Sequence, residues 1–257
     1  MPELPDLEVF SHNLNKTLAG KEISEVEIKN ARKLNTTSKE LKAGIEDQKL
    51  KKVYRDGKEL FFEFSNGNIL GLHLMLHGEL HLSKEKEKYN HTIISLAFSD
   101  GHELVLTDFQ GAAVVSLNPE QKKAPDALSK EMTVEYLKEV VQKSRAAIKN
   151  ILLDQKIIRG IGNAYADEIL WDAGISPFSP GKNIPDNKVT ALAKSIRQVL
   201  TDAQEEIRKA DPDIITGEIR HFLKIHNSKK KTSPTGATIK VKTATRKTYY
   251  TDEQEEF

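Results

Sequence analysis

The sequence predicts an α+β fold in which a helix and a β-sandwich or barrel come first, followed by a helical segment and a short β-hairpin. Three observations predict it. Apolar and polar residues alternate in short segments between residues 23 and 107, which is typical of half-buried strands. From Thr133 the apolar period becomes that of a helix, and after Phe222 the chain is β-prone again.

The first element is expected to be a helix. Leu7, Phe10, Leu14 and Leu18 recur at intervals of three or four residues, so they share one helical face. Gly20 follows the last of them, and glycine is common just beyond a helix C-terminus.

Six strands are expected after this helix, each a short alternating segment. They cover residues 23–28, 50–54, 60–64, 69–74, 92–98 and 103–107. Asp56-Gly57 and Asn66-Gly67 separate consecutive segments, and such dipeptides tolerate the positive φ of tight hairpin turns.

A helical domain and a basic hairpin are expected to complete the chain. The helical period begins at Val134 and Leu137, and prolines with polar neighbours mark the boundary before it. Residues 234–236, Pro-Thr-Gly, are typical of a turn between Lys-rich strands. The expected domains are residues 1–128, 129–222 and 223–257.

Composition indicates a soluble globular protein large enough for two domains. The chain has 257 residues, 38% hydrophobic and 30% charged, and no apolar run reaches the length of a membrane span. There is no apolar signal segment at the N-terminus. With no cysteine, a disulfide framework and a thiolate zinc site are excluded. We expect an intracellular, cytoplasmic protein.

Charge is unevenly distributed although the net charge is only +1. Nine Lys or Arg residues and no acidic residue occur between Arg220 and Thr251, interleaved with Tyr249 and Tyr250. A field of one sign suits a polyanion such as nucleic acid. The alternative is a solvated basic face or a disordered tail.

The first residues could carry a covalent catalyst. Removal of Met1, which a following proline permits, would expose a secondary amine at Pro2. Such an amine can attack a sugar or carbonyl carbon and form an iminium, and with a pKa near ~8 it is partly unprotonated at neutral pH. Glu3 would supply a proton donor or acceptor beside it. The alternative is a stiff, extended lead into the first helix.

A glycine-rich turn separates two expected helices. Gly160-Ile161-Gly162 ends the first, and Asn163 is expected to cap the second. Backbone N–H groups at such a helix start could bind a phosphate. The alternative is a purely structural corner.

Four segments, spread over nearly the whole chain, together resemble the formamidopyrimidine-DNA glycosylase and endonuclease VIII family of base-excision enzymes. They are residues 2–5, Gly57-Lys58 at a hairpin tip, residues 153–168 as a helix-two-turns-helix motif, and residues 246–250 as a strand of the family's zinc finger. The resemblance implies an N-terminal helix plus two-sheet β-sandwich, then a helix-two-turns-helix domain with a C-terminal β-hairpin finger.

The resemblance implies a bifunctional DNA glycosylase and abasic-site lyase of base-excision repair. Pro2 would attack C1′ of a flipped damaged nucleotide, Glu3 would protonate the sugar oxygen, and Lys58 would hold a nearby phosphate. Strand cleavage by β- or β,δ-elimination would follow. The expected DNA-binding residues are Asn163, Arg246, Lys149 and Lys247. Glu168 matches an acidic family position, with a structural carboxylate as the alternative.

The implied partner is damaged DNA, bound by a monomer without metal or other cofactor, at the nucleoid if the source is bacterial. Family members usually build the finger around four cysteines that bind zinc, and this chain has none. Threonines at 232 and 235 and residues 251–254 occupy those places. A zincless finger is therefore expected, held by strand pairing and by packing of Ile239, Val241 and Tyr249.

The loops that family members insert into DNA also differ here. A methionine, an arginine and a phenylalanine usually fill the space left by the flipped base. Leu76, or Met75 if the loop shifts by one residue, matches the methionine, and small residues replace the other two. Phe109 is a further candidate, with a core or turn aromatic as the alternative. Abasic sites, oxidised pyrimidines, hydantoins and lesions in single-stranded or crosslinked DNA are expected before oxidised guanine opposite cytosine.

Two other classes of function remain. A relative whose chemistry has decayed would only bind damaged DNA, although the joint presence of Pro2, Glu3 and Lys58 argues against it. An RNA- or ribosome-binding protein would explain the basic C-terminal segment but not the N-terminal proline.

Overall fold

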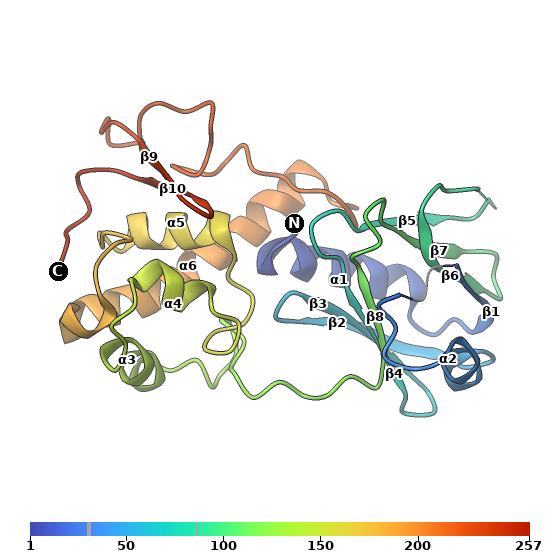
Figure 1. Cartoon of the computed structure of the whole chain (residues 1–257). Coiled ribbons are helices and arrows are strands. Elements are labelled where there is room, and N and C mark those ends of the chain that lie inside the picture. Colours follow the sequence, from blue (N-terminus) through green and yellow to red (C-terminus); the bar gives the residue numbers. More distant parts are fainter. Residues whose placement is uncertain (30–31, 86) are drawn as a thin grey trace. The chain divides into compact units, whose positions relative to one another are not determined.

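The computed structural model describes residues 1–29, 32–85 and 87–257 of the chain (Figure 1). These residues divide into two compact units. The first contains Met1–Gln121 and Ile207–Glu218, and the second contains Lys122–Glu206 and Ile219–Phe257. Within the described ranges, no helix is long and apolar enough to cross a membrane. The three-domain division expected from the sequence stays a prediction.

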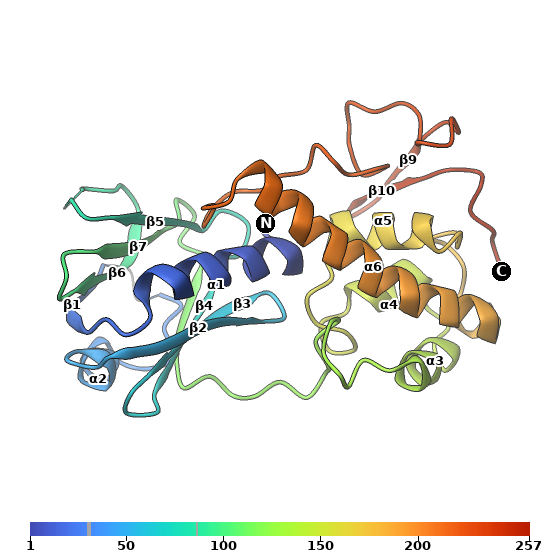
Figure 2. The same ribbon diagram turned by 180° about the vertical axis from the view of Figure 1, so that it is seen from behind.

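The leading helix is confirmed as α1 (Leu4–Leu18), which begins three residues earlier than the apolar period indicated. It lies along β2 (Leu50–Asp56), as Figure 2 shows, and buries its apolar face. Leu7 and Phe10 on this face are at most 1% exposed. Gly20 follows the helix with a φ of 84°, which a side chain would disfavour.

Two four-stranded antiparallel sheets follow, so the structure has the two sheets of a sandwich rather than one barrel. In strand order, the first sheet consists of β1 (Ile23–Ile28), β6 (Thr92–Phe98), β7 (Glu103–Thr107) and β5 (Glu79–Ser83). The second consists of β2, β3 (Glu59–Phe64), β4 (Ile69–His73) and β8 (Val114–Leu117). Gly57 and Gly67, with φ of 62° and 86°, form the two predicted hairpin turns of this second sheet.

Three elements of the first unit were not predicted, namely α2 (Ser38–Ile45), β5 and β8. The helix has only 8 residues and buries only Leu41 and Ile45, so it shows little helical period. The two strands lie at the edges of their sheets and have only 5 and 4 residues, and each buries a single residue. Segments this short give little periodic signal.

The second unit contains the expected helices. They are α3 (Val134–Gln142), α4 (Ile148–Leu153), α5 (Asn163–Asp172), the 3-10 helix η1 (Gly181–Asn183) and all but the last residues of α6 (Asp186–Ala210). Thr133 caps α3, where its side chain accepts a hydrogen bond from the Tyr136 N–H.

The C-terminal hairpin pairs β9 (Lys240–Thr243) with β10 (Lys247–Tyr250), and β10 lies beside α5 (Figure 1). Tyr249 is buried as expected, at 7% exposed, and Ile239 is half-buried. The expected packing of Val241 is wrong, because its side chain is 48% exposed on a strand with no buried residue.

Hydrogen bonds hold the base of the finger where cysteines were expected. The Glu253 carboxylate accepts from the hydroxyls of Thr235 at 2.9 Å and Thr251 at 3.2 Å. Gln254 donates to the carbonyl of Ile175 at 2.8 Å, which ties the C-terminal segment to the end of α5. The side chains that the structure describes include no group of three or more His, Cys, Asp or Glu that could hold a metal ion.

Candidate active site and nucleic-acid interface

The N-terminal candidates lie at the start of α1. Pro2 is buried, and Glu3 is 5% exposed and serves as the N-cap residue of the helix. The Glu3 N–H donates to Asp6 Oδ2 at 2.8 Å, and the Glu3 carboxylate accepts from the Asp6 N–H in a reciprocal capping box. The positive end of the helix dipole favours a carboxylate there. Glu3 is therefore held beside the position that the Pro2 amine would occupy.

Sequence reasoning missed a second carboxylate at this end of the chain. The Met1 amino group donates a hydrogen bond to Glu218 Oε1. The segment that carries Glu218 is fixed to the first unit by two hydrogen bonds: Asn13 Nδ2 donates to the Ile214 carbonyl at 2.9 Å, and the Leu80 N–H donates to Thr216 Oγ1 at 3.2 Å. No motif marks Glu218, because chain folding brings it there from 217 residues away.

Lys58 lies half-buried at the tip of the β2–β3 hairpin, directly after Gly57. Arg55 near this tip donates through Nε to Glu8 Oε2 on α1 at 2.7 Å, and the arginine side chain is only 6% exposed. This ion pair joins the hairpin that carries Lys58 to the helix that Glu3 caps. All three expected catalytic residues therefore lie at the ends of helices or strands that are joined to one another within the first unit.

The loop between β4 and β5 displays one of the candidate wedge residues. The Met75 N–H donates to His73 Nδ1 at 3.0 Å, and Met75 itself has a φ of 55°, which is unusual for a long side chain. Leu76 at the tip is 57% exposed. Gly78 closes the loop, because a Cβ there would lie 2.3 Å from the Leu74 carbonyl oxygen. Of the two alternatives, Leu76 is the exposed one.

The loop between β7 and β8 displays the other candidate. The buried Asp108 carboxylate accepts hydrogen bonds from the N–H groups of Gln110, Ala112 and Ala113 at 2.7 to 2.9 Å. Phe109 is thereby held outside, 61% exposed, so it is not a core aromatic. Its ring centroid lies 4.5 Å from that of His77, so the two loops meet.

In the second unit, the turn between α4 and α5 differs from prediction in one detail. Gly160 breaks the chain as expected, with a φ of 103°. The cap residue of α5 is Gly162, and Asn163 is instead the first helical residue. Asn163 Nδ2 donates to the Lys247 carbonyl at 3.0 Å, so its side chain is turned toward the hairpin rather than its own helix start.

Lys149 is placed differently from an exposed DNA-binding cation. Its side chain is 7% exposed, and Nζ forms an ion pair with Asp167 Oδ1 at 2.7 Å. Nζ also donates to Thr248 Oγ1 at 2.9 Å and to the Lys247 carbonyl at 3.2 Å. The second Asp167 oxygen accepts from the Tyr249 N–H at 2.9 Å. This buried pair therefore organises β10, and sequence reasoning missed its acidic half.

Glu168 is a structural carboxylate, which was the alternative given for it in the sequence analysis. Its carboxylate is 3% exposed and accepts from the N–H groups of Lys224, Ile225 and His226 at 2.7 to 2.8 Å. Burial raises the pKa of Glu168, while these three hydrogen bonds act in the opposite direction. The side chain is committed to the segment before the hairpin.

The hairpin turn presents the expected cations to solvent. Arg246 and Lys247 are exposed, and Arg246 lines a hollow of about 370 Å³ together with Lys149, Lys242 and Phe178. Lys242 Nζ lies 4.5 Å from the centre of the Phe178 ring, which holds a third cation at this edge. A concave basic surface of this kind suits a phosphate backbone.

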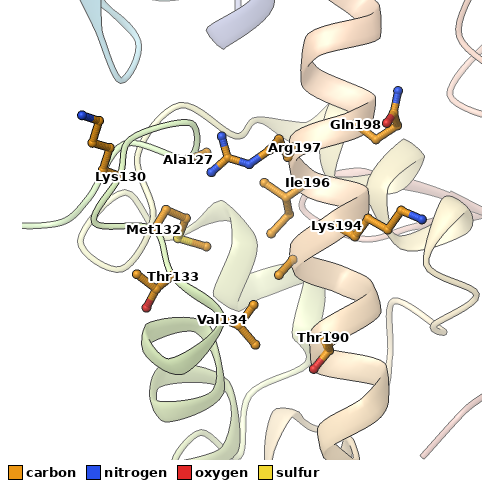
Figure 3. A pocket seen from close by; sticks show the side chains of 11 residues that line it. Ala127, Lys130, Met132, Thr133, Val134, Thr190, Lys194, Ile196, Arg197 and Gln198 are labelled. Atoms are coloured by element: carbon orange, nitrogen blue, oxygen red, sulfur yellow. The ribbon is translucent and has the colours of Figure 1, made fainter.

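Another hollow of the second unit, of about 480 Å³, lies between α6 and the start of α3 (Figure 3). Met132, Val134 and Ile196 face it, while Lys194 points away (Figure 3). No His, Asp or Glu side chain lines it, and neither does any expected site residue. It therefore offers neither a carboxylate nor an imidazole for acid–base chemistry.

Two family models match most of the chain. Residues 1–115 match the model of the formamidopyrimidine-DNA glycosylase N-terminal domain, and residues 124–211 match that of the formamidopyrimidine-DNA glycosylase H2TH domain. The formamidopyrimidine-DNA glycosylase of Carboxydothermus hydrogenoformans is 32% identical over 235 residues, 88% of each chain. That of Rickettsia peacockii is 30% identical over 273 residues, 97% of each chain.

Solved structures are similar over the whole fold. Lactococcus lactis Fpg in complex with abasic-site DNA has a TM-score of 0.87 at 25% identity, covering 97% of this chain and 98% of that one. A structure of MutM in complex with DNA containing carbocyclic 8-oxo-G has a TM-score of 0.86 at 26% identity, with the same coverage. The predicted fold class is thereby confirmed.

Proposed function

Because the chain belongs to the formamidopyrimidine-DNA glycosylase family of DNA repair enzymes, we propose that it is a bifunctional DNA glycosylase and abasic-site lyase that acts through Pro2. The observation that carries the proposal is the start of α1, where the capping box holds the Glu3 carboxylate beside Pro2. A DNA-binding protein without chemistry has no need of an amine and a carboxylate so arranged.

In the first step, the Pro2 amine, freed by removal of Met1, attacks C1′ of the flipped nucleotide. The new N–C1′ bond replaces the bond to the damaged base, which leaves with the electron pair and takes up a proton. Glu3 donates a proton to the sugar ring oxygen, so the ring opens and an iminium forms. Glu218, which pairs with the terminal amine of the unprocessed chain, is suited to accept the proton that the Pro2 amine loses.

In the second step, the iminium acidifies the C2′ proton, and its removal expels the 3′ phosphate by β-elimination. A further elimination can expel the 5′ phosphate, and water then releases the sugar fragment from Pro2. Lys58 holds a phosphate beside the lesion as a point charge. No redox step occurs, so the proposed reaction needs no redox cofactor.

The second unit supplies the grip on the DNA backbone. Arg246 and Lys247 at the hairpin turn bind phosphates, and Asn163 binds a neighbouring phosphate from the helix-two-turns-helix motif. The buried Lys149 side chain holds the hairpin strand that carries Lys247 in place, through its hydrogen bonds to the Lys247 carbonyl and the Thr248 hydroxyl. One chain carries both sets of residues, so we propose a monomer, acting in the cytoplasm and, if bacterial, at the nucleoid.

The proposed lesion range follows from the two exposed loops. Leu76 and Phe109 would fill the space left by the flipped base, but neither can hydrogen-bond to the opposite base as an arginine can. Discrimination of the opposite base should then be weak. We propose abasic sites, oxidised pyrimidines and hydantoins, and lesions in single-stranded or crosslinked DNA, as better substrates than oxidised guanine opposite cytosine.

Borohydride trapping on abasic-site DNA tests the chemistry. Protein confirmed to lack Met1 should form a covalent adduct, and adducts should be lost or strongly reduced in Pro2→Gly and in protein that retains Met1. Glu3→Gln should keep DNA binding and lose base excision. Absence of any adduct while DNA binding is intact would instead support a decayed, binding-only relative.

A further inference from the structure

A hollow of about 280 Å³ in the first unit adjoins the two exposed loops, and of its lining residues only Phe109 has a role in the function proposed above. Its aromatic, imidazole and hydroxyl side chains are those of His77, His81, Tyr89, His91, Thr107 and Phe109. We propose that this hollow binds one unstacked nucleobase of the DNA on which the protein acts. The inference rests on the proposed function only in taking DNA as the ligand.

Flat ring pairs make up the walls. The His81 and Tyr89 rings stack with centroids 4.2 Å apart and planes 20° apart. The His77 and Phe109 ring centroids lie 4.5 Å apart with the planes tilted by 45°, and Phe109 is 61% exposed at the rim. Every nucleobase has a π-face that stacks on such rings, whatever its sequence identity. Two ring pairs around one small hollow therefore fit a planar heteroaromatic ligand.

Polar groups at the hollow can bind the edge of a base. His81 Nε2 lies 3.1 Å from Thr107 Oγ1, which orients the imidazole. Glu79 and Asn90 also line the hollow and supply a carboxylate and an amide. The volume lies just below the range of about 300–1,000 Å³ for small-molecule sites, so a single base fits better than a larger ligand.

The backbone around the hollow is fixed before any ligand arrives. The Asp108 N–H donates to the His91 carbonyl at 3.0 Å, which joins the Phe109 loop to the start of β6. His91 has a φ of 57°, and such conformations persist only where surrounding bonds enforce them. A site that is already ordered loses little entropy on binding.

The base could come from two positions in the DNA. It could be the base opposite the flipped nucleotide, which loses its partner, or a neighbouring base that the wedge residues unstack. Both present the same heteroaromatic face and edge, so the position of a fluorescent base analogue distinguishes them.

The test uses duplexes with a tetrahydrofuran abasic analogue and 2-aminopurine either opposite the analogue or next to it. Binding of the native protein should quench 2-aminopurine at one of these positions, because the base stacks on the ring walls. Tyr89→Ala and His81→Ala should abolish the quench and weaken binding by about tenfold, the equivalent of one base–aromatic stack. Tyr89→Phe keeps the ring and should retain the quench. His12→Ala, an exposed histidine on α1, is the matched control.

Quenching at either position that is lost in Tyr89→Ala supports the site and identifies the source of the base. Unquenched emission at both positions, or a quench unaffected by Tyr89→Ala and His81→Ala, overturns it. Borohydride trapping of the native protein on abasic DNA is measured in parallel. Trapping without quenching rejects only the hollow, whereas quenching without trapping rejects only the proposed lyase.

Discussion

The two units fix their exposed segments by buried carboxylates, but over very different distances along the chain. In the first unit, Asp108 accepts hydrogen bonds from N–H groups two to five residues away. In the second, Glu168 and Asp167 bind N–H groups 56 to 82 residues away. A carboxylate with local partners shapes one loop. A carboxylate with distant partners joins segments that are far apart in the sequence, so its loss should lower the stability of the whole unit.

Asp167→Asn should have the largest effect on stability. The substitution leaves the buried Lys149 ammonium without its ion-pair partner, and breaking a buried pair in this way typically costs about 3–5 kcal/mol. Urea unfolding followed by circular dichroism measures the change. Asp252→Asn is the control, because the Asp252–Lys240 pair is exposed and solvent screening leaves it little effect on stability. Equal effects of the two variants would mean that the buried Asp167–Lys149 pair stabilises the second unit no more than an exposed pair does.

Glu168→Gln should come next, because one amide oxygen replaces two carboxylate oxygens that accept three N–H groups. A buried N–H left without an acceptor costs about 1–3 kcal/mol. The effect should depend on pH. Since burial raises the pKa of Glu168 in the folded protein, the folded state binds this proton more tightly than the unfolded state.

The stability linked to that proton is therefore fully present below the ordinary pKa of 4.5 and is lost as pH rises through the raised value. The free energy of unfolding of the native protein should fall relative to Glu168→Gln across this window. Urea titrations at a series of pH values measure the difference. If the unfolding free energy of the native protein instead rose with pH relative to that of Glu168→Gln, the expected direction would be wrong.

Asp108→Ala should cost less stability but alter a binding loop. Three backbone N–H groups lose their acceptor, yet the loop can open to water, so the cost should be near the low end of about 1–3 kcal/mol. Phe109 would lose its fixed position, and binding to abasic-site DNA should weaken by more than global unfolding explains. Fluorescence anisotropy at a temperature where the variant is folded checks this. Unchanged affinity would mean that the loop does not contact DNA.

Leu76→Ala should have the smallest effect on folding, within about 0.5 kcal/mol, because the side chain is 57% exposed. The effect on DNA binding should differ between damaged and undamaged duplexes. Affinity for a duplex with an abasic analogue should fall while affinity for undamaged duplex stays the same, since only the former offers a space to fill. Val241→Ala, a second exposed apolar residue, serves as the control and should change neither.

Local sequence patterns determined most of the fold. The alternation in residues 92–98 and 103–107 predicted β6 and β7 to the residue, and Asp56-Gly57 placed the hairpin that carries Lys58. The motifs also predicted the family. These succeeded because period, turn chemistry and motif spacing are properties of neighbouring residues.

Tertiary structure decided what neighbouring residues do not encode. Glu218 reaches the N-terminus, and Lys149, one of the expected DNA-binding residues, is a buried partner of Asp167. Each position depends on contacts with residues distant in the sequence. Asn163 is likewise directed by the carbonyl of Lys247, 84 residues away, rather than by its own helix. The sequence determined most of the elements and the family, but not α2, β5 and β8. Burial and long-range hydrogen bonds decided which charged groups face solvent and which stabilise the fold.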